Sequence, residues 1–205
     1  MIVVIDYGIG NTGSVVNALN KLGVSNKISS DESLFRKAKA LILPGVGNAG
    51  QGMENLKKRG LDKVIIKEIR RDKPLLGICL GMQLLFERSE EGNVACLGVY
   101  KGMVKKFRKE KKIPQIGWNS VKINDTNKEV KKLLSGIPDK SYFYFVNSFY
   151  CLPEDKSIIV GESNYGEQFA SIVAKQKVVG VQFHPEKSGK VGFILLKDFI
   201  KNYVN

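Results

Sequence analysis

Two separate stretches of the sequence carry side chains suited to nucleophilic chemistry. Residues 77–81 read Gly-Ile-Cys-Leu-Gly, which places the thiol of Cys79 between two glycines. The chain's single histidine, His184, is followed two residues later by Glu186. A nucleophilic cysteine needs a base, and that base needs a group that orients it. The residue types therefore predict a Cys79–His184–Glu186 triad, if folding brings the two stretches together.

The surroundings of Cys79 predict a sharp turn from a strand into a helix. Residues 75–78 form a short apolar run typical of a buried strand, and residues 80–87 are mostly strong helix formers. Gly-x-Cys-x-Gly at such a joint is the thiol version of the nucleophile elbow, and the helix N-terminus favours a thiolate. The alternative is a buried, unreactive cysteine, which is the common state of a free thiol.

His184 stands at the end of another predicted strand, the apolar part of residues 169–181 and its continuation to Phe183. Open α/β sheets place reactive groups at such strand ends. Pro185 favours an extended backbone at His184 and ends the strand, and Glu186 is near enough to reach back to the imidazole. The final helix, to about Tyr203, carries an apolar face that indicates core packing.

The remaining elements divide the chain into two halves of different character. Strands at 2–6 and 40–43 alternate with helices through 22, over 31–39 and over 53–71, the last broken at Gly60. The second half reads as β-structure over 97–107, 117–123, 141–150, 157–163 and 169–181, with a short helix near 129–134 that Thr126 and Glu129 could cap. This order predicts a twisted, mostly parallel central sheet with an antiparallel β extension.

Residues 44–52, Pro-Gly-Val-Gly-Asn-Ala-Gly-Gln-Gly, follow the second of these strands. Four glycines in nine residues let the backbone take unusual angles and point N–H groups inward. An ordinary flexible loop is one interpretation. The functional one is half of an oxyanion hole beside the elbow.

Composition bounds the kind of protein. The 205 residues suit one domain over 1–205, and 43% hydrophobic residues with a mean hydropathy of -0.13 are typical of a soluble globular protein. No apolar run has membrane-spanning length, and residues 1–6 read as a strand rather than a signal peptide. Three cysteines without metal-site spacing favour a reducing cytoplasm and no bound metal.

The chain is strongly basic, with 33 Lys and Arg against 20 Asp and Glu, a net charge of +13. Much of this charge lies in lysine and arginine runs at residues 105–106, 108–109, 111–112 and 131–132. No aromatic residues alternate with these lysines and no nucleic-acid motif accompanies them, so we expect a solvated surface, with no nucleic-acid partner.

A competing motif lies near the N-terminus. Gly8, Gly10 and Gly13 follow a predicted strand and open a predicted helix, with Asp31 and Glu32 downstream. That arrangement matches the dinucleotide-binding fingerprint. The same glycines also serve simply to turn a strand into a helix, so the motif alone leaves both interpretations open.

Several motifs together resemble a known family. The run from Gly77 to Gln83 with His184-Pro185-Glu186 resembles the class I glutamine amidotransferases. Six segments resemble more narrowly the glutaminase subunits of imidazole glycerol phosphate synthase: residues 6–11, 44–47, 81–86, 117–119, 144–148 and 183–188. The similarity extends over essentially the whole chain, and it removes most of the case for a dinucleotide.

The resemblance implies a three-layer α/β fold and a glutaminase reaction without a cofactor. Cys79 would attack the side-chain amide of L-glutamine, while His184, oriented by Glu186, would protonate the departing ammonia. Backbone N–H groups of Val46, Gly47 and Leu80 would hold the oxyanion. The family positions that hold glutamine correspond to Gly47, Gln83, Glu91, Asn147 and Ser148.

The resemblance also implies a partner. Ammonia would pass to a (β/α)8 cyclase in a heterodimer, which would make imidazole glycerol phosphate and an aminoimidazole carboxamide ribotide in histidine biosynthesis. Trp118 and Asn119 lie in the motif found at that interface, although Trp118 alone also suits a core. The alternative acceptor is an amino sugar in surface polysaccharide synthesis.

The chain departs from the family pattern at Thr12-Gly13, at Asn48-Ala49 and at Asn147, where the family has histidine. None of these departures touches the triad.

Overall fold

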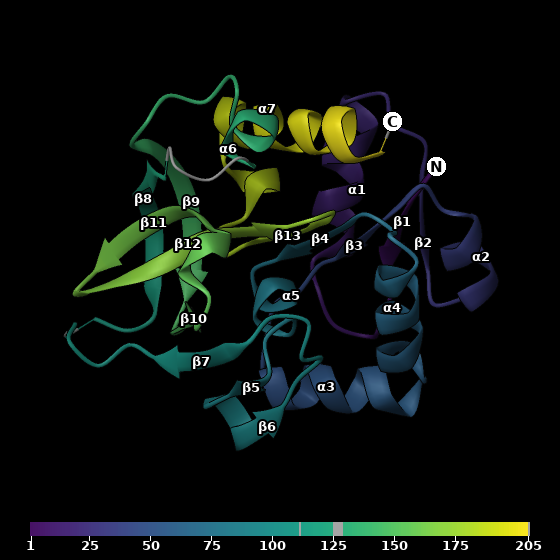
Figure 1. Ribbon diagram of the computed structural model, residues 1–205, viewed down its shortest axis with the longest axis horizontal. Helices are drawn as coiled ribbons and strands as arrows, with labels where there is room; N and C mark the ends of the chain where they lie inside the picture. The colour runs from purple at the N-terminus through teal and green to yellow at the C-terminus, as the bar shows by residue number, and fades with distance from the viewer. Residues whose placement is uncertain (111, 125–128, 205) are drawn as a thin grey trace.

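A single large sheet with helices on both faces organises the protein (Figure 1). The computed structural model describes residues 1–110, 112–124 and 129–204. Within these residues the strands are β1 Ile2–Ile5, β2 Asn26–Ser29, β3 Ala40–Leu43, β4 Leu75–Ile78, β5 Arg88–Ser89, β6 Val94–Ala95, β7 Gly102–Lys106, β8 Gln115–Ile123, β9 Ser141–Asn147, β10 Phe149–Pro153, β11 Ile159–Tyr165, β12 Glu167–Lys175 and β13 Val178–Val181.

The helices are α1 Thr12–Lys21, α2 Glu32–Lys37, α3 Ala49–Lys58, α4 Leu61–Arg70, α5 Leu80–Gln83, α6 Val130–Leu133 and α7 Gly189–Phe199. Short 3-10 turns cover η1 Glu91–Asn93, η2 Lys156–Ile158 and η3 Pro185–Lys187, and α7 continues as a π-helical segment, η4 Ile200–Val204. Among the described residues, no helix is long and apolar enough to cross a bilayer.

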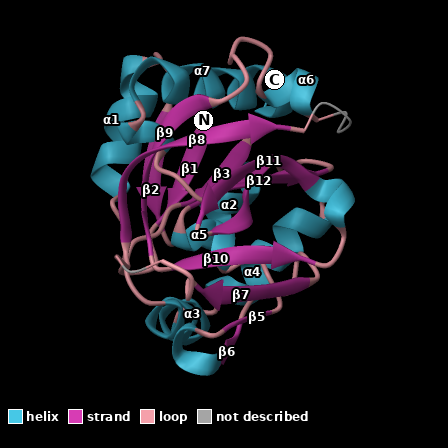
Figure 2. Cartoon of the chain, turned by 90° about the vertical axis from the view of Figure 1, so that its left-hand side faces the viewer, coloured by secondary structure: helices cyan, strands magenta, loops and turns pink. Residues whose placement is uncertain are grey.

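The sheet has a parallel centre and an antiparallel extension, as predicted. The strands β2-β1-β3-β4-β13 pair in parallel. Beyond β13, the sheet continues antiparallel through β12 and β10 to β7, and β11, β8 and β9 branch from β12. Figure 2 turns this β-rich side toward the viewer. Since β4 and β13 are parallel neighbours, their carboxyl ends lie at the same edge.

Two hydrophobic cores, one on each face of the sheet, make the three layers. Along β1, Val4 belongs to the core under α1 and α7, whereas Val3 belongs to the core under α3 and α4. This alternation follows from the two-residue period of a strand. The strand is therefore buried on both faces, which is the usual reason that parallel strands read as continuous apolar runs.

Most sequence-predicted elements are present, with informative shifts. The helical region predicted over 53–71 is broken at Gly60 as expected, because Gly60 adopts a left-handed conformation (φ +67°) between α3 and α4. The first of these helices begins earlier, at Ala49, since the Asn48 side chain accepts a hydrogen bond from Gln51 N and caps it. The short helix predicted near 129–134 is α6, while its proposed cap Thr126 lies outside the described residues.

The helix predicted over 80–87 is shorter than expected, because α5 ends at Gln83. The carbonyls of residues 84–86 accept hydrogen bonds from the backbone N–H groups of residues 97–100. These tertiary bonds replace the helical ones, so helix propensity is overridden after one turn. The helix dipole behind Cys79 is correspondingly shorter than the sequence suggests.

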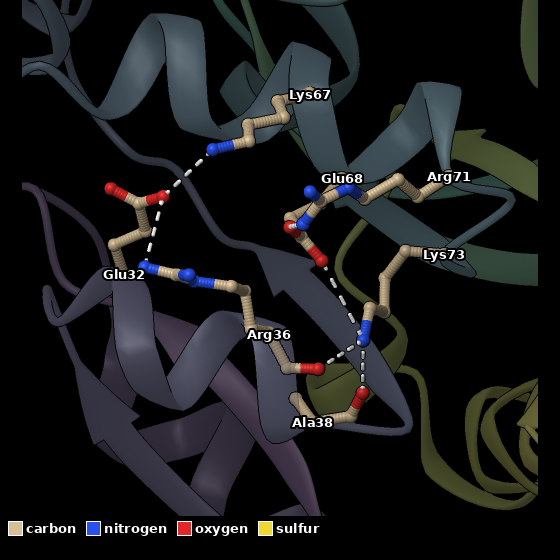
Figure 3. Close-up of polar contacts among 7 residues, drawn as sticks. All are labelled: Glu32, Arg36, Ala38, Lys67, Glu68, Arg71 and Lys73. Carbon is tan, nitrogen blue, oxygen red and sulfur yellow. Dashed lines mark hydrogen bonds and ion pairs between the residues drawn. The ribbon is translucent and has the colours of Figure 1, made fainter.

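An ion-pair cluster ties the helices together at the amino ends of the central strands (Figure 3). Lys73 Nζ lies 3.6 Å from Glu68 Oε2 and donates to the carbonyl oxygens of Arg36 (2.9 Å) and Ala38 (2.5 Å). Glu68 also pairs with Arg71 at 3.1 Å. The cluster links the end of α2 to α4 and β4, at the opposite edge of the sheet from Cys79.

Candidate active site

The nucleophile elbow predicted around Cys79 has a strained backbone. Cys79 has φ 53° and ψ -109°, an unusual conformation for a residue with a side chain, and its N–H donates to Val181 O at 2.7 Å. A Cβ added at Gly77 would lie 2.8 Å from Gly81 O, and one at Gly81 would lie 1.8 Å from Leu43 O. Both glycines are therefore needed to let the turn close against its neighbours.

The end of β13 places His184 beside this elbow. Val181 is paired with Ile78 in parallel register, so the residues that follow the two strands emerge together. Strand β9 holds the segment, because His184 N donates to Tyr144 O at 2.9 Å and Tyr144 N donates to Ser188 Oγ at 3.0 Å. Ser188 Oγ in turn donates to His184 O at 2.6 Å.

The three predicted triad residues come together in the fold. His184 Nδ1 lies 2.9 Å from Glu186 Oε1, and the imidazole shares a hydrogen bond with Cys79. His184 and Glu186 are almost completely buried. Burial lowers the pKa of His184, but hydrogen bonds and charge interactions with Cys79 and Glu186 outweigh it and raise the pKa from 6.5 to about 10. An imidazolium is thus favoured at neutral pH.

A cavity of about 240 Å³ opens at Cys79 and His184. It is lined by nine of the residues predicted for the site, Val46, Gly47, Cys79, Leu80, Gln83, Glu91, Asn147, Ser148 and His184, and by three others, Pro114, Val146 and Phe149. Drug-sized ligands occupy pockets of roughly 300–1,000 Å³. The smaller volume here suits a single amino acid.

Two predicted substrate residues, Gln83 and Asn147, hold the main chain at one wall of this cavity. Both donate to the carbonyl oxygen of Phe149, from Gln83 Nε2 at 3.1 Å and from Asn147 Nδ2 at 3.0 Å. That bond fixes which end of the Asn147 amide is free, and its Oδ1 is buried without a partner among the described residues. The two amides thereby position the Ser148–Phe149 backbone.

Glu91 lines the same cavity. Its Oε2 accepts a hydrogen bond from Ala49 N, in the first turn of α3, at 2.7 Å. Burial raises the pKa of Glu91, and the Ala49 hydrogen bond offsets only part of that shift. The adjoining departure from the family pattern, Asn48-Ala49, therefore supplies the cap of α3 and the anchor of Glu91.

Sequence reasoning missed Gln182. This side chain is fully buried, donates from Nε2 to Cys79 Sγ at 3.6 Å, and accepts from Gln83 Nε2 at 3.1 Å. Gln182 connects the thiol to the Gln83 amide, which holds Phe149. A signal was present in the sequence, since a polar residue inside an apolar strand two positions before His184 requires buried hydrogen-bond partners.

The predicted interface residues take different places. Trp118 is 56% exposed on β8, and its ring contacts that of Tyr144 at 6.0 Å between centroids. The Asn119 side chain instead donates to Asn164 O at 2.9 Å, which attaches β8 to the end of β11.

Other residues of the protein pack against Gly8 and Gly10, in the loop that resembled a dinucleotide fingerprint. Gly8 and Gly10 have φ of +86° and +123°, and the loop connects β1 to α1. A Cβ at Gly8 would lie 2.9 Å from the Arg59 guanidinium, and one at Gly10 3.5 Å from Pro44. The glycines therefore permit close packing of this turn. The described residues also contain no group of three or more His, Cys, Asp or Glu side chains arranged for a metal ion.

A thiol, an imidazole and a carboxylate that meet at the carboxyl ends of parallel strands are the groups that cysteine-dependent hydrolases use. Residues 3–202 match the model of the family described as glutamine amidotransferase class-I. The chain belongs to this family, and its fold and activity are those of a glutamine-hydrolysing enzyme.

Two relatives and one solved structure are similar to this chain over nearly its whole length. The chain is 46% identical over 202 residues to the imidazole glycerol phosphate synthase subunit HisH of Dehalococcoides mccartyi strain 195, covering 98% of this chain and 97% of that protein. It is 47% identical over 204 residues to subunit HisH 2 of Methanococcus maripaludis, covering 98% and 99%. A solved glutamine amidotransferase has the same fold, with a TM-score of 0.77 at 18% identity and 99% coverage of both chains.

Proposed function

We propose that this chain is the glutaminase subunit of an imidazole glycerol phosphate synthase and supplies ammonia for histidine biosynthesis. The glutaminase part of this proposal is supported by one observation: Cys79, His184 and the loop residues Val46 and Gly47 line the same cavity. The names of the relatives support the acceptor. These names favour the histidine-pathway acceptor over an amino sugar, which no observation on this chain supports.

The reaction follows from the charge arrangement. The Cys79 thiolate attacks Cδ of L-glutamine, and the carbonyl electron pair moves to oxygen. When that oxyanion collapses, the C–N bond breaks, and the His184 imidazolium gives its proton to the departing nitrogen, which leaves as ammonia. Water then attacks the glutamyl thioester and gives a proton to neutral His184, and the C–S bond breaks. This restores the Cys79 thiolate and the His184 imidazolium and releases glutamate, whose new carboxyl group loses its proton to solvent. Glu186, 2.9 Å from Nδ1, keeps the ring oriented throughout.

The oxyanion needs donors where charge develops. In our proposal these are the backbone N–H groups of Val46, Gly47 and Leu80, three residues that line the cavity together with Cys79. Leu80 is the first residue of α5, where an N–H has no acceptor within the helix. Gly47 has φ +106°, a conformation that lets its loop turn toward the sulfur.

The amino-acid end of glutamine is held by the remaining wall of the cavity. We assign Glu91 as acceptor for the α-ammonium group because its carboxylate is half-buried and lines the cavity. The main chain at Ser148, whose neighbour Phe149 is fixed by Gln83 and Asn147, contacts the rest of the substrate. Neither a metal nor a cofactor takes part in this scheme.

The proposal treats residues 1–205 as one glutaminase domain, because the sheet passes through both halves of the chain. It places the protein in the cytoplasm, since a working Cys79 has to stay reduced and the other two cysteines, Cys96 and Cys151, are also free thiols.

We propose further that an aromatic face on β8 and β9 binds the synthase partner, a (β/α)8 cyclase, in a heterodimer. Ile116, Trp118 and Tyr142 are each at least 56% exposed, and they share one face of this strand pair with Tyr144 and Val146. Val146 also lines the active-site cavity, so a partner on this face would cover the mouth through which ammonia leaves. Asn119 alternates with Trp118 along β8 and shares the other face with the buried Phe143, so its side chain is not part of this docking face.

The catalytic assignment is tested by replacing the thiol. In the complex with its synthase partner, Cys79→Ala should abolish glutamine-dependent product formation and leave ammonium-dependent formation intact. Cys96→Ala, which removes a half-buried thiol outside the cavity, is the matched control and should behave as wild type. Loss of the ammonium-dependent rate as well, or glutamine-dependent turnover by Cys79→Ala, would contradict the assignment.

The docking face is tested by binding. Trp118→Ser should weaken partner affinity by about tenfold or more, as for a central aromatic in an interface. Ile28→Ser, at an exposed apolar residue on the distant strand β2, should leave affinity unchanged. Equal effects of the two substitutions would place the partner elsewhere.

A further inference from the structure

The Tyr7 side chain lies at the end of β1 and has no part in the chemistry described so far. It is completely buried, and its hydroxyl donates to Pro44 O at 2.7 Å. Burial, and then the charge interaction with Cys79, raise the pKa of Tyr7 well above its usual range, so the hydroxyl stays protonated and remains a donor. The tyrosine thus joins the end of β1 to the loop that follows β3.

That loop also packs against the elbow. A Cβ at Gly45 would lie 2.6 Å from Leu80 Cβ, 2.8 Å from Gly81 N and 2.9 Å from the Tyr7 hydroxyl. The tyrosine hydroxyl and the first turn of α5 therefore leave no room for a side chain at Gly45. The next two residues, Val46 and Gly47, line the active-site cavity.

The Tyr7 hydroxyl therefore holds the carbonyl of Pro44, and the elbow packs against the next residue, Gly45. We propose that Tyr7 is a positioning residue that fixes the distance between Cys79 and the Val46–Gly47 N–H groups through its bond to Pro44 O. This inference rests on the proposed oxyanion role of that loop. It assigns a catalytic consequence to the tyrosine in the Asp-Tyr-Gly segment at residues 6–8.

The requirement is one of geometry in the transition state. Oxyanion donors act only when they stand at hydrogen-bond distance from the oxygen as charge develops on it, and bound glutamine carries little such charge. A loop released from Tyr7 should therefore reduce kcat while leaving glutamine affinity nearly unchanged. A tyrosine that merely filled space would change stability alone.

Tyr100 provides a matched control within the same chain. It is also buried, and its hydroxyl donates to a backbone carbonyl, Val178 O, at the same 2.7 Å. Val178 begins β13, at the end of that strand opposite His184. Replacing Tyr7 or Tyr100 with phenylalanine therefore removes the same kind of bond, once beside the loop and once away from it.

The experiment measures glutamine hydrolysis and inhibition by the γ-aldehyde analogue of glutamine, L-glutamate γ-semialdehyde, in the full chain with its partner. The Cys79 thiolate bonds to the aldehyde carbon and the carbonyl electron pair moves to oxygen, so nothing leaves, and the His184 imidazolium balances the charge on that oxygen. This adduct carries the tetrahedral oxygen that the N–H groups would bind. Urea unfolding of each variant is measured in parallel.

We expect Tyr7→Phe to lower kcat and weaken aldehyde binding by about tenfold each, a part of the ~10²–10³-fold cost of losing one oxyanion donor outright. KM for glutamine should stay within about twofold of wild type, as for an interaction made only in the transition state. Tyr100→Phe should match Tyr7→Phe in stability loss and keep wild-type kcat and aldehyde affinity.

If Tyr7→Phe and Tyr100→Phe have the same kcat and aldehyde affinity, Tyr7 is structural and the inference is wrong. Gly45→Ala is a second variant, in which the added Cβ crowds Leu80, Gly81 and the Tyr7 hydroxyl and so displaces the loop. It should reproduce the kinetic signature of Tyr7→Phe, and wild-type kcat in folded Gly45→Ala protein also overturns the inference. Persistent hydrolysis by Cys79→Ala would instead refute the proposed function.

Discussion

The close contact between Gly81 and Leu43 offers the sharpest test of how the fold supports the site. Gly81 follows Cys79 in the elbow, and Leu43 is the last residue of β3, directly before the loop at Val46 and Gly47. In Gly81→Ala, the new Cβ would lie 1.8 Å from Leu43 O, whereas real Cβ atoms essentially never approach closer than 3.0 Å. The substitution therefore has to push the elbow away from the end of β3.

The size of that displacement sets the expected loss. The Cβ and Leu43 O must separate by about 1.2 Å, and neither atom can rotate aside because the backbone fixes the position of both. A misplacement of ~1 Å can cost about 10²-fold in rate, so kcat should fall by about two orders of magnitude. Overpacking of this kind should also lower the free energy of unfolding by about 1–3 kcal/mol.

Steady-state glutamine hydrolysis and urea unfolding measure the two effects. Gly13→Ala is the matched control, because Gly13 lies within α1 and an added Cβ there meets no atom within 4 Å. That control should keep wild-type kcat and gain about 0.5–1 kcal/mol of stability from improved helix propensity. A folded Gly81→Ala protein with the wild-type kcat would refute the argument that contact between elbow and strand end positions the site.

Three further outcomes are expected. Lys73→Met should destabilise the fold by about 3 kcal/mol, because it removes the buried cation beside Glu68, leaves that carboxylate with the half-exposed Arg71, and removes the donor to the carbonyls of Arg36 and Ala38. Lys67→Met at an exposed pair should have almost no effect in urea unfolding, and kcat should not change in either variant. Folding raises the pKa of His184 from 6.5 to about 10, so the stability that its protonation contributes is complete below pH 6.5 and is lost as the pH rises to about 10. Urea unfolding of wild type and His184→Gln across that range should show the difference in unfolding free energy becoming smaller, and a constant difference would contradict the raised pKa. Because burial raises the pKa of Glu91, KM for glutamine should increase as the pH falls through that pKa, while Glu91→Gln should have a high KM at every pH; a wild-type KM in that variant would remove Glu91 from the substrate site.

The sequence was most informative where one local pattern determines one structure. The apolar run before Cys79, the glycines around it and the strand before His184 predicted β4, the elbow and the end of β13 correctly. Gly60 likewise predicted the break between α3 and α4. In each case, backbone geometry or strand burial restricts the residue types, so the pattern can be read without knowledge of distant contacts.

Helix length after Cys79 shows where local reasoning fails. Residues 80–87 have high helix propensity, yet α5 ends at Gln83 because the backbone of residues 97–100 takes the carbonyls of residues 84–86. A propensity of a few tenths of a kcal/mol per residue is smaller than the gain from such hydrogen bonds and the burial that accompanies them. No residue within 80–87 indicates that the N–H groups of a distant segment will bond to these carbonyls.

What the sequence determined by itself was the set of chemical groups and the type of each element: a thiol in a tight turn, a lone imidazole at a strand end, and a sheet of alternating βα units followed by β-structure. Only the tertiary structure decided which groups meet. The parallel pairing of β4 with β13 brings Cys79 beside His184, and folding places Gln182 on the sulfur and Tyr7 on Pro44. These contacts join residues far apart in the chain, and strand order and register, set by packing of the whole sheet, fix them.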